Sequence, residues 1–454
     1  MEKSNYVRIP WRMERIPPNN YTRKIAFILG LCFFFEWVDN GSISYFLPVF
    51  AAEFGLTKET LGYIGAVSNI GVMVGSLISG LVSDKIGRKK VIIGAMVLWG
   101  IAGLVQAASQ DLTMLIATRI LLGLGIGIQL SATITLVSES VPSKMRSKYT
   151  VLLLCLAPIG STVAGLLCYF MLPSSLGWRG VSVVESVPAL IALVIWKVVP
   201  ESALWLEAKG RRDEADAIMS KIEKHVEEAL NAPLPAPQIP VSAPVAAKTK
   251  ADDGQSQFAK LLSKRYLKTN IMISVWWPAT MIATYGLTTW FTNIFVEKGI
   301  ALSSSIAYVS IMTLGGAGGV FVIPKLMEKV GRKITCIIIG VIAAVSAYLY
   351  GSAEIIPLLI LFGMMFNFGA QGVAQVSVTY ASELYPTSVR NTGVGYAQFI
   401  GRLGSVLGPV ILGYIMRGFG VQSAVYFAAL MYVIGGAFVL LFGEETRGKV
   451  FTDE

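Results

Sequence analysis

The sequence is poor in charge: Asp, Glu, Lys and Arg make up 15% of its 454 residues, whereas apolar types make up 54%. Soluble domains carry about 25% charged residues, so the composition excludes an ordinary soluble protein and indicates many membrane spans. The only histidine, His225, lies in a polar segment, which excludes a histidine proton relay inside the membrane. The four cysteines lie in apolar runs without metal or disulfide spacing, so we interpret them as packing residues: Cys32, Cys155, Cys168 and Cys336.

Motifs for catalysis are also missing. The sequence has no nucleophile with an adjacent base, no metal-ligand cluster and no Walker-type phosphate loop, so it predicts neither an enzyme nor a cofactor nor ATP coupling. Gly123, Gly125 and Gly127 follow no strand and stand in an apolar run, which indicates close helix packing.

The formal net charge of +10 at first suggests a nucleic-acid partner. The basic residues, however, gather in short segments between apolar runs, at 85–90, 144–148 and 325–333, while the alternate loops are short and not basic. By the positive-inside rule, this asymmetry places the basic loops and both termini in the cytoplasm. It predicts an integral protein of the plasma (inner) membrane, with the lipid bilayer as its partner and no nucleic acid.

Twelve apolar runs are long enough to be spans, and they predict an all-α membrane protein. They lie at about 25–47, 61–82, 91–110, 112–138, 150–172, 180–199, 270–296, 303–327, 334–351, 355–380, 391–416 and 420–442. The predicted organisation is a cytoplasmic tail (1–24), a six-helix bundle (25–199), a cytoplasmic segment (200–268), a second six-helix bundle (269–442) and a cytoplasmic tail (443–454). Within the central segment we expect an amphipathic helix over 201–230, a Pro/Ala-rich linker over 232–250 and a short surface helix over 258–267.

The two halves repeat each other with a constant shift of 244 positions. The shift relates Gly87-Arg88 to Gly331-Arg332 and Glu201 to Glu445. It also relates Glu139, Pro142 and Arg146 to Glu383, Pro386 and Arg390. One offset at separated places predicts two duplicated bundles related by a pseudo-twofold axis along the membrane normal. We expect a monomer.

These motifs resemble the major facilitator superfamily over nearly the whole chain. The loop Gly80–Lys90 (GLVSDKIGRKK) is similar to its signature between the second and third helices, and Arg119 with Gly123 and Gly127 to its fourth-helix motif. Two segments resemble sugar-porter elements: PES followed by WL at 200–206, and ETRG at 445–448. A third segment resembles metabolite:proton symporters, namely ELYPTSVRNTGVG at 383–395. The resemblance implies a secondary transporter that works by alternating access.

Two departures narrow what the resemblance implies. The double-glutamine motif of sugar porters is absent from the seventh span, where the chain reads WWPATMIATYGLTTWFTNIF at 276–295, so a hexose substrate is disfavoured. The second copy of the loop signature carries Pro324 where the first has Gly80.

Buried charge points to the site. Glu36, Asp39 and Asn40 share one face of the first span, where each charge costs about 2.5 to 3.5 kcal/mol to insert. At 1.5 Å per residue, Asp39 lies about 21 Å from the start of its span, Arg402 about 18 Å from Arg390, and Arg119 about 12 Å from the other side, so all three lie near the midplane. We predict that Asp39, together with Glu36, takes up a proton and pairs with Arg119 in a protonation-dependent way. The alternative is that the acids only neutralise buried arginines.

An arginine at mid-depth suits a substrate carboxylate, and we assign that role to Arg402. Polar stripes on the seventh, tenth and eleventh spans add hydrogen-bonding groups, with an aromatic wall. The expected substrate-binding residues are Arg402, Asn367, Gln371, Gln375, Gln398, Tyr285, Thr289, Trp290 and Asn293. For each polar residue, interhelical hydrogen bonding is the alternative role.

Charged residues of the basic loops form a predicted conformational latch. These charges would pair across the two halves in the outward-facing state, and the pairs would break when the protein opens inward. The alternative is that the charges only belong to a solvated cytoplasmic turn. Its members are Asp84, Arg88, Glu139 and Arg146 in the first half and Glu328, Arg332, Glu383 and Arg390 in the second.

The sequence therefore predicts a proton-coupled symporter of a small polar metabolite, with an organic or sugar acid favoured over a polyol or neutral sugar derivative. An uncoupled facilitator is the nearest alternative. A ligand-binding membrane sensor is a further one.

Overall fold

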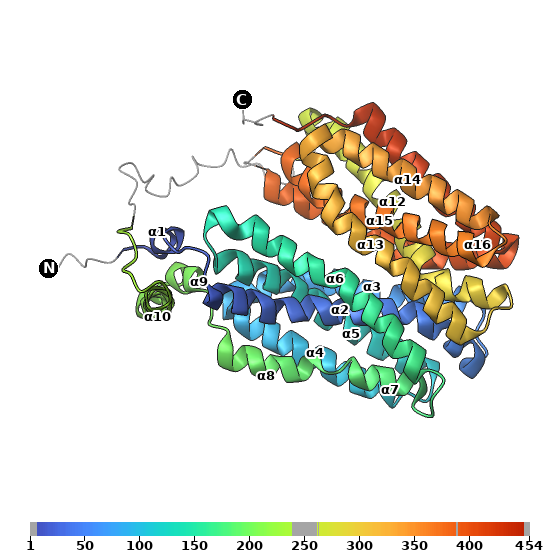
Figure 1. Cartoon of the computed structure of the whole chain (residues 1–454), viewed down its shortest axis with the longest axis horizontal. Coiled ribbons are helices and arrows are strands. Elements are labelled where there is room, and N and C mark those ends of the chain that lie inside the picture. The colour runs from blue at the N-terminus through green and yellow to red at the C-terminus, as the bar shows by residue number, and fades with distance from the viewer. Residues whose placement is uncertain (1–6, 238–260, 262, 387–388, 449–454) are drawn as a thin grey trace.

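The computed structural model describes residues 7–237, 261, 263–386 and 389–448, with only the backbone at 147, 148, 150, 151, 154, 155 and 391, and this part of the chain is helical without strands. Two bundles of long helices lie against each other (Figure 1). The first contains α2 (Asn20–Phe54), α3 (Lys58–Ile86), α4 (Arg88–Ala107), α5 (Leu112–Glu139), α6 (Ser143–Met171), α7 (Gly177–Val184) and α8 (Pro188–Val198). The second contains α12 (Leu267–Glu297), α13 (Leu302–Val330), α14 (Arg332–Ser352), α15 (Ile356–Leu384) and α16 (Arg390–Phe442), after the short helix η1 (Lys264–Tyr266).

The twelve expected spans correspond to these helices. Nine helical stretches of the described chain are long and apolar enough to cross a membrane, counting α7 with α8 as one and α16 as one. α16 contains two spans, because Gly420 breaks its helix with φ of 83°, a value that favours glycine. The remaining two spans are α6 and α12. The fold is thus an all-α membrane protein of twelve spans in two six-helix bundles.

Three elements differ from expectation. The first span begins at Asn20, where Asn19 caps the helix by accepting a 2.8 Å hydrogen bond from the backbone N–H of Thr22. The sixth span is interrupted between α7 and α8, ahead of Pro188, a residue that favours the first turn of a helix. The helix expected over 201–230 is two helices, α9 (Ala203–Ala208) and α10 (Arg212–Leu230). The expected linker at 232–250 lies mostly outside the described residues.

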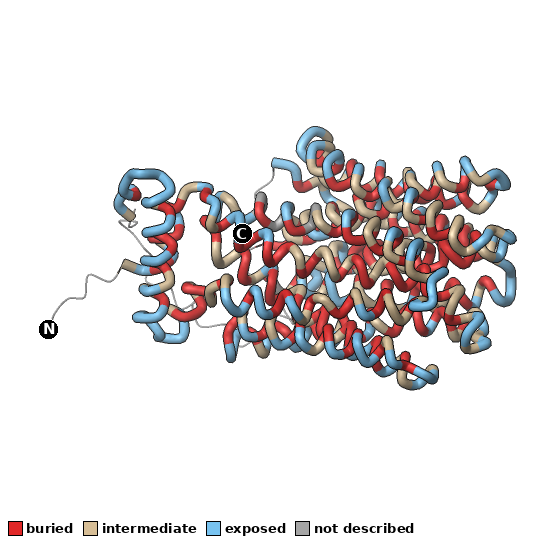
Figure 2. The backbone as a smooth tube through the Cα atoms, turned by 60° about the horizontal axis from the view of Figure 1, so that its bottom comes forward, coloured by how far each residue is buried: buried red, intermediate tan, exposed pale blue. Residues whose placement is uncertain are grey.

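The outer faces of the bundles are apolar. Leu81, Phe170, Phe321 and Leu441 each expose two thirds or more of their surface, and Figure 2 shows buried and exposed positions alternating along the helices. Such a surface is unstable in water but matches a lipid environment. Inside the first bundle, α3 and α5 pack closely: a Cβ on Gly123 would lie 2.0 Å from the Ser68 carbonyl oxygen, as expected from the glycine pattern.

A small helical cluster caps one end of the first bundle. There α1 (Ile9–Glu14) packs on α9 and α10 through buried Ile9, Met13, Trp205 and Met219. Figure 1 shows α1, α9 and α10 beyond the ends of the spans, on the side that also holds the basic loops. We call this side the basic end and the other side the opposite end.

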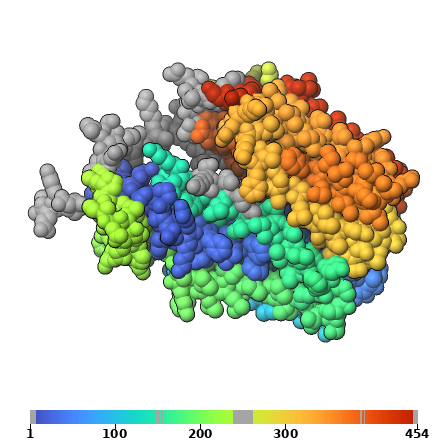
Figure 3. Space-filling view, in the orientation of Figure 1, coloured from blue at the N-terminus to red at the C-terminus, as the bar shows by residue number. Residues whose placement is uncertain are grey.

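The bundles touch each other from mid-depth to the opposite end. Lys58 Nζ lies 2.8 Å from Glu297 Oε2, the hydroxyls of Tyr63 and Tyr414 lie 2.8 Å apart, and Glu59 pairs with Arg417. At the basic end, no hydrogen bond or ion pair joins the bundles among the described residues. The ribbons accordingly diverge toward that end (Figure 1), and the two halves occupy separate sides of the space-filling view (Figure 3).

Candidate functional site

A buried ion pair lies in the first bundle. Arg119 Nη1 of α5 donates a 3.0 Å hydrogen bond to Asp39 Oδ1 of α2, and the two side chains are 1% and 4% exposed. The guanidinium carbon of Arg119 lies 5.7 Å from the ring centre of Phe46. The sequence predicted this pairing from depth alone. Its burial makes it costly to break, because a lone charge has no water to solvate it.

A cavity of about 30 Å³, which we call the charged cavity, adjoins this pair. Its wall includes Asp39, Arg119 and Arg402, the three charged residues that the sequence placed near the midplane, together with Glu36. Arg402 comes from α16 in the second bundle, whereas the other three come from the first. The volume suffices for one or two water molecules, so a proton has room to reach the acids.

The structure adds one acid that the sequence reading missed. Glu185 lies at the break between α7 and α8, is 1% exposed, and neither of its carboxylate oxygens has a hydrogen-bond partner among the described residues. The groups that act on it are the charges of Asp39 and Arg119 and the hydroxyl of Ser42. A lone glutamate within the sixth apolar run was the signal that could have identified it.

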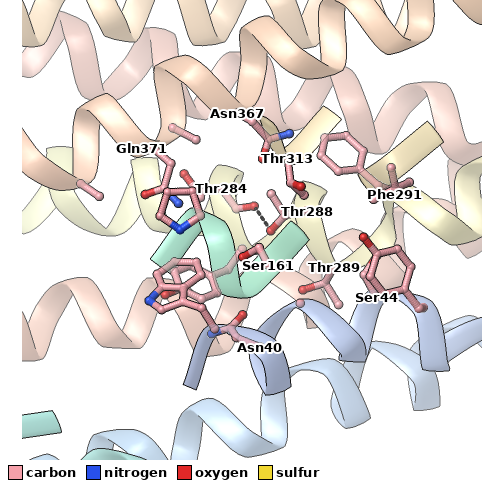
Figure 4. A pocket seen from close by; sticks show the side chains of 18 of the residues that line it. Asn40, Ser44, Ser161, Thr284, Thr288, Thr289, Phe291, Thr313, Asn367 and Gln371 are labelled. Carbon is pink, nitrogen blue, oxygen red and sulfur yellow. Dashed lines mark hydrogen bonds between the residues drawn. The ribbon is translucent and has the colours of Figure 1, made fainter. Parts of the chain in front are cut away.

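A larger cavity of about 150 Å³, the main cavity, lies between the two bundles. Figure 4 shows Asn40 of α2, Ser161 of α6, Thr284 and Thr288 of α12, and Asn367 of α15 around it. Its aromatic wall comprises Trp37, Tyr45, Tyr285 and Phe291, and no charged residue of the described chain lines it. The two cavities share three residues: Asn40, Tyr285 and Thr289.

Five of the nine expected substrate-binding residues line these cavities. Asn367 and Gln371 line the main cavity, Arg402 the charged cavity, and Tyr285 and Thr289 both. In Figure 4, Asn367 and Gln371 lie on the opposite side of the cavity from Asn40. Such a lining offers amide, hydroxyl and aromatic contacts to a small polar ligand.

The other four line neither cavity. Trp290 is fully buried, and its indole N–H donates a 3.1 Å hydrogen bond to the Pro409 carbonyl, so its polar group is already used within the second bundle. Asn293 is buried, Gln375 is half-buried and Gln398 is exposed. The stripes at Gln375, Asn293 and Gln398 therefore did not identify residues that line either cavity.

The predicted latch forms ion pairs within each bundle. In the first, Arg88 lies 3.1 Å from both Asp84 and Glu139. Its backbone N–H and that of Lys89 donate to Glu201 Oε1 at 3.0 and 3.1 Å. Glu201 thus binds the first free N–H groups of α4, a favourable position for an anion.

The second bundle repeats this arrangement 244 positions later. Arg332 lies 2.7 Å from Glu383, and Glu445 accepts from the backbone N–H groups of Arg332 at 2.8 Å and Lys333 at 3.2 Å. Burial opposes ionisation of Glu445, but its backbone hydrogen bonds outweigh this and lower its pKa. Gly87 and Gly331 permit the approach: their φ values are 102° and 97°, and a Cβ on Gly331 would lie 2.4 Å from Glu445 Oε2.

The remaining latch members stand apart from these pairs. Arg146 and Glu328 are exposed, and Arg390 Nε donates to the Tyr385 carbonyl at 3.2 Å. Among the described residues, no ion pair of this set joins the two bundles. A latch between the halves is therefore not formed in this conformation, in which the basic end is the separated one. Within the same residues, no group of three or more His, Cys, Asp and Glu is arranged to hold a metal ion.

Comparisons with known proteins agree with this architecture. The profile of the Major Facilitator Superfamily matches residues 29–366 and 325–454. The niacin transporter NiaP of Acinetobacter baylyi is 31% identical over 439 residues, covering 96% of this chain and 97% of that protein. The 4-hydroxybenzoate transporter PcaK of Pseudomonas putida is 27% identical over 400 residues, covering 86% of each chain. The crystal structure of a D-xylose-proton symporter superposes with a TM-score of 0.73 at 18% identity, covering 95% of this chain and all of that one.

Proposed function

The chain belongs to the major facilitator superfamily and is a membrane transporter, and from this premise we propose that it moves a small organic acid together with a proton. The observation that carries the proposal is the buried Asp39–Arg119 pair beside a cavity that also contains Arg402 of the other bundle. A titratable acid and a carboxylate-binding arginine then share one water-sized space.

The two bundles supply the moving parts. Their contacts at the opposite end and their separation at the basic end support a state that is open toward the basic end. We infer that this end is cytoplasmic in the inner membrane, by the positive-inside rule, so the state is inward-facing. The return to the outward-facing state brings the basic loops together, where Arg88 and Arg332 with their acids can form the latch across the halves. Since one chain supplies both walls of the main cavity, the transporting unit is a monomer.

Proton coupling follows from the pair and the membrane potential. Protonation of Asp39 cancels its attraction for Arg119 and lowers the cost of rearranging α2 against α5. Bringing an anion inward against a negative interior costs about 2.3 kcal/mol per 100 mV, roughly a fiftyfold penalty in accumulation. One accompanying proton removes that penalty, which is why an importer of acids benefits from coupling.

The lining supports a planar monocarboxylic acid as substrate. Tyr285 and Trp37 offer stacking faces, Asn367 and Gln371 offer hydrogen bonds to ring substituents, and Arg402 offers two parallel hydrogen bonds to a carboxylate. Niacin and 4-hydroxybenzoate, which the similar transporters carry by name, are acids of this class.

A second candidate is a neutral polyol or sugar derivative, with or without proton coupling. The observation that favours it is the main cavity, which has hydroxyl and amide groups but no charged lining residue in the described chain. A neutral ligand that fills this cavity has no need of Arg402.

The test is uptake into proteoliposomes with an acidic exterior. We expect labelled nicotinate or 4-hydroxybenzoate to accumulate, a protonophore to abolish the accumulation, and Asp39→Asn to lose accumulation while keeping exchange of internal for external substrate. Equilibration without accumulation, unaffected by the protonophore, would instead establish a facilitator. Uptake of a polyol but of neither acid would favour the second candidate.

A further inference from the structure

Glu36 and Arg402 face the same small space from different bundles. Glu36 lies on α2 and is 7% exposed, and its Oε2 has no hydrogen-bond partner among the described residues. Arg402 lies on α16, and its guanidinium forms no hydrogen bond or ion pair with the described residues. Of the charges that act on Glu36, that of Arg402 is the strongest and that of Asp39 is next. Arg402 is thus the main charge acting on Glu36, although no direct ion pair joins the two side chains in the described chain.

A count of ionisable groups shows an imbalance. Three carboxyl groups face two guanidinium groups: Asp39 acts on both Glu36 and Glu185, Arg402 acts on Glu36, and Arg119 acts on Asp39 and Glu185. Asp39 and Arg119 neutralise each other in a direct ion pair. Arg402 then has Glu36 as its counter-charge, and any further anion makes the site more negative. Buried charge without compensation is costly, so a bound anion must either displace a carboxylate or bring a proton.

We propose that Glu36 is the resident counter-ion of Arg402 and that the carboxylate of the substrate displaces it, whereupon Glu36 takes up the proton that accompanies the substrate. The proposal rests on the proposed function and refines it, because it assigns the substrate-linked proton to Glu36. The step is a simple protonation: a proton from cavity water joins the Glu36 carboxylate, and the substrate anion takes its place beside Arg402. The site gains one negative and one positive charge, so its net charge is unchanged.

The surroundings of Glu36 fit this exchange. The titratable or charged groups that face it are Cys32 and Asp39 on its own helix, Arg119 on α5, Tyr285 on α12 and Arg402 on α16. Asp39 is held by Arg119, and the other two groups, Cys32 and Tyr285, carry no carboxylate. Glu36 is therefore the acid of the charged cavity that is free to change both partner and proton.

Residues common to the two cavities provide the route for the substrate carboxylate. Tyr285 and Thr289 line both spaces, so a ligand ring in the main cavity lies next to the charged cavity. Asn40, one residue from Asp39, lines both as well. A planar acid can thus keep its ring against Tyr285 while its carboxylate reaches toward Arg402.

Linkage gives a measurable consequence. If binding of one anion takes up one proton, the dissociation constant rises about tenfold per pH unit wherever Glu36 is ionised in the free protein. Replacing the Glu36 carboxyl by an amide removes this dependence of the dissociation constant on pH. The wild-type protein should therefore bind an acid more weakly at each higher pH, whereas Glu36→Gln should bind it with a nearly constant affinity and, at high pH, more tightly than the wild type.

The experiment uses the purified full-length protein in detergent, with nicotinate and 4-hydroxybenzoate as anionic probes and nicotinamide as a neutral one. Equilibrium binding is measured from pH 5.5 to 8.5, and proton uptake is measured with an indicator dye in weak buffer. We expect about one proton per anion in the wild type and in Glu354→Gln, whose exposed carboxylate lies outside the site. We expect none in Glu36→Gln, and none on binding of nicotinamide.

Arg402 and Asp39 supply the matched variants. Arg402→Gln should lower the affinity for the anions at least tenfold more than the affinity for nicotinamide. Asp39→Asn should still take up a proton when an anion binds. If Glu36→Gln is lost during purification, Glu36→Asp replaces it and should keep the pH slope, since it keeps a carboxylate. Undiminished proton uptake by Glu36→Gln, loss of uptake only in Asp39→Asn, or anion binding to wild type without a proton would overturn the inference. None of those results contradicts proton-driven accumulation in proteoliposomes, so the proposed function would remain. Failure of both anions to bind would refute the acid substrate and this inference together.

Discussion

The Asp39 carboxylate and the Arg119 guanidinium meet at 3.0 Å with almost no exposed surface, although their positions lie 80 residues apart. Two Arg119 nitrogens, Nε and Nη2, have no hydrogen-bond partner among the described residues. The guanidinium therefore depends on Asp39 for its only direct carboxylate contact. The pair holds α2 against α5 and makes the site sensitive to loss of either charge.

Single neutralisations of this pair should destabilise the protein unequally. Breaking a buried pair costs about 3 to 5 kcal/mol. Arg119→Gln should cost less than Asp39→Asn, because an unpaired aspartate can bind a proton whereas an unpaired arginine stays charged. We expect both variants to unfold at lower temperature in detergent and the double variant to recover part of the loss. A double variant less stable than Asp39→Asn would contradict this account.

Gln371 and Gln398 form a matched pair for testing the main cavity. Gln371 lines it, whereas Gln398 is exposed and lines neither cavity. Loss of one neutral hydrogen bond costs about 0.5 to 1.5 kcal/mol, so Gln371→Ala should raise the KM for transport about twofold to tenfold. Gln398→Ala should leave the KM unchanged. Initial rates of uptake measure both, and equal effects would remove Gln371 from the binding site.

Ion pairs at the opposite end should set the conformational balance. Lys58 with Glu297 and Glu59 with Arg417 join the two bundles there. Glu59→Gln with Glu297→Gln should weaken this closure and shift the protein toward the state that is open at the opposite end. Electron–electron distances between spin labels at positions 52 and 301 should lengthen in a larger fraction of molecules. An unchanged distance distribution would show that the apolar contacts alone hold this end shut.

The docking of α1 on α10 should weaken in acid. Arg12 binds both carboxylate oxygens of Glu223, at 3.0 and 2.6 Å, and Arg15 binds one of them at 2.6 Å. Burial raises the pKa of Glu223, but these hydrogen bonds outweigh it, so its pKa lies below that of a free glutamate. The interaction is thus fully present above about pH 4.3 and is lost as the pH falls through the lowered pKa.

Hydrogen exchange at the amides of α1, corrected for intrinsic rates, measures this loss. Protection should fall in the wild type between neutral pH and pH 3. In Glu223→Gln it should already be low at neutral pH and lose little more in acid. Glu228→Gln, at an exposed position of the same helix, should behave as the wild type. Protection that is independent of both pH and Glu223 would assign the docking to the apolar contacts of Ile9 and Met13.

The fold could be predicted from the sequence because each span is an apolar run and because the 244-residue shift identifies the duplication. The position of the charged cavity could be predicted from depth, since residue counts along helices convert directly into height. The rotation of each helix about its own axis, which decides the side chains that face the cavity, could not be predicted. Asn293 and Gln398 fit polar stripes, yet inside a bundle every helix has several faces, and only packing decides which face meets the cavity. Glu185 was missed because a single acid in an apolar run forms no pattern.

The duplicated arrangement around Glu201 and Glu445 bears on the history of the molecule. Each copy is complete within its own half, as a duplicated six-helix unit predicts. The site is different: the 244-residue shift replaces its ionisable groups with uncharged ones, namely Thr280 for Glu36, Ala283 for Asp39, Gly363 for Arg119, Ala429 for Glu185 and Pro158 for Arg402. The scaffold is thus symmetric between the two halves, whereas each ionisable group around the charged cavity occurs in only one of the two related positions.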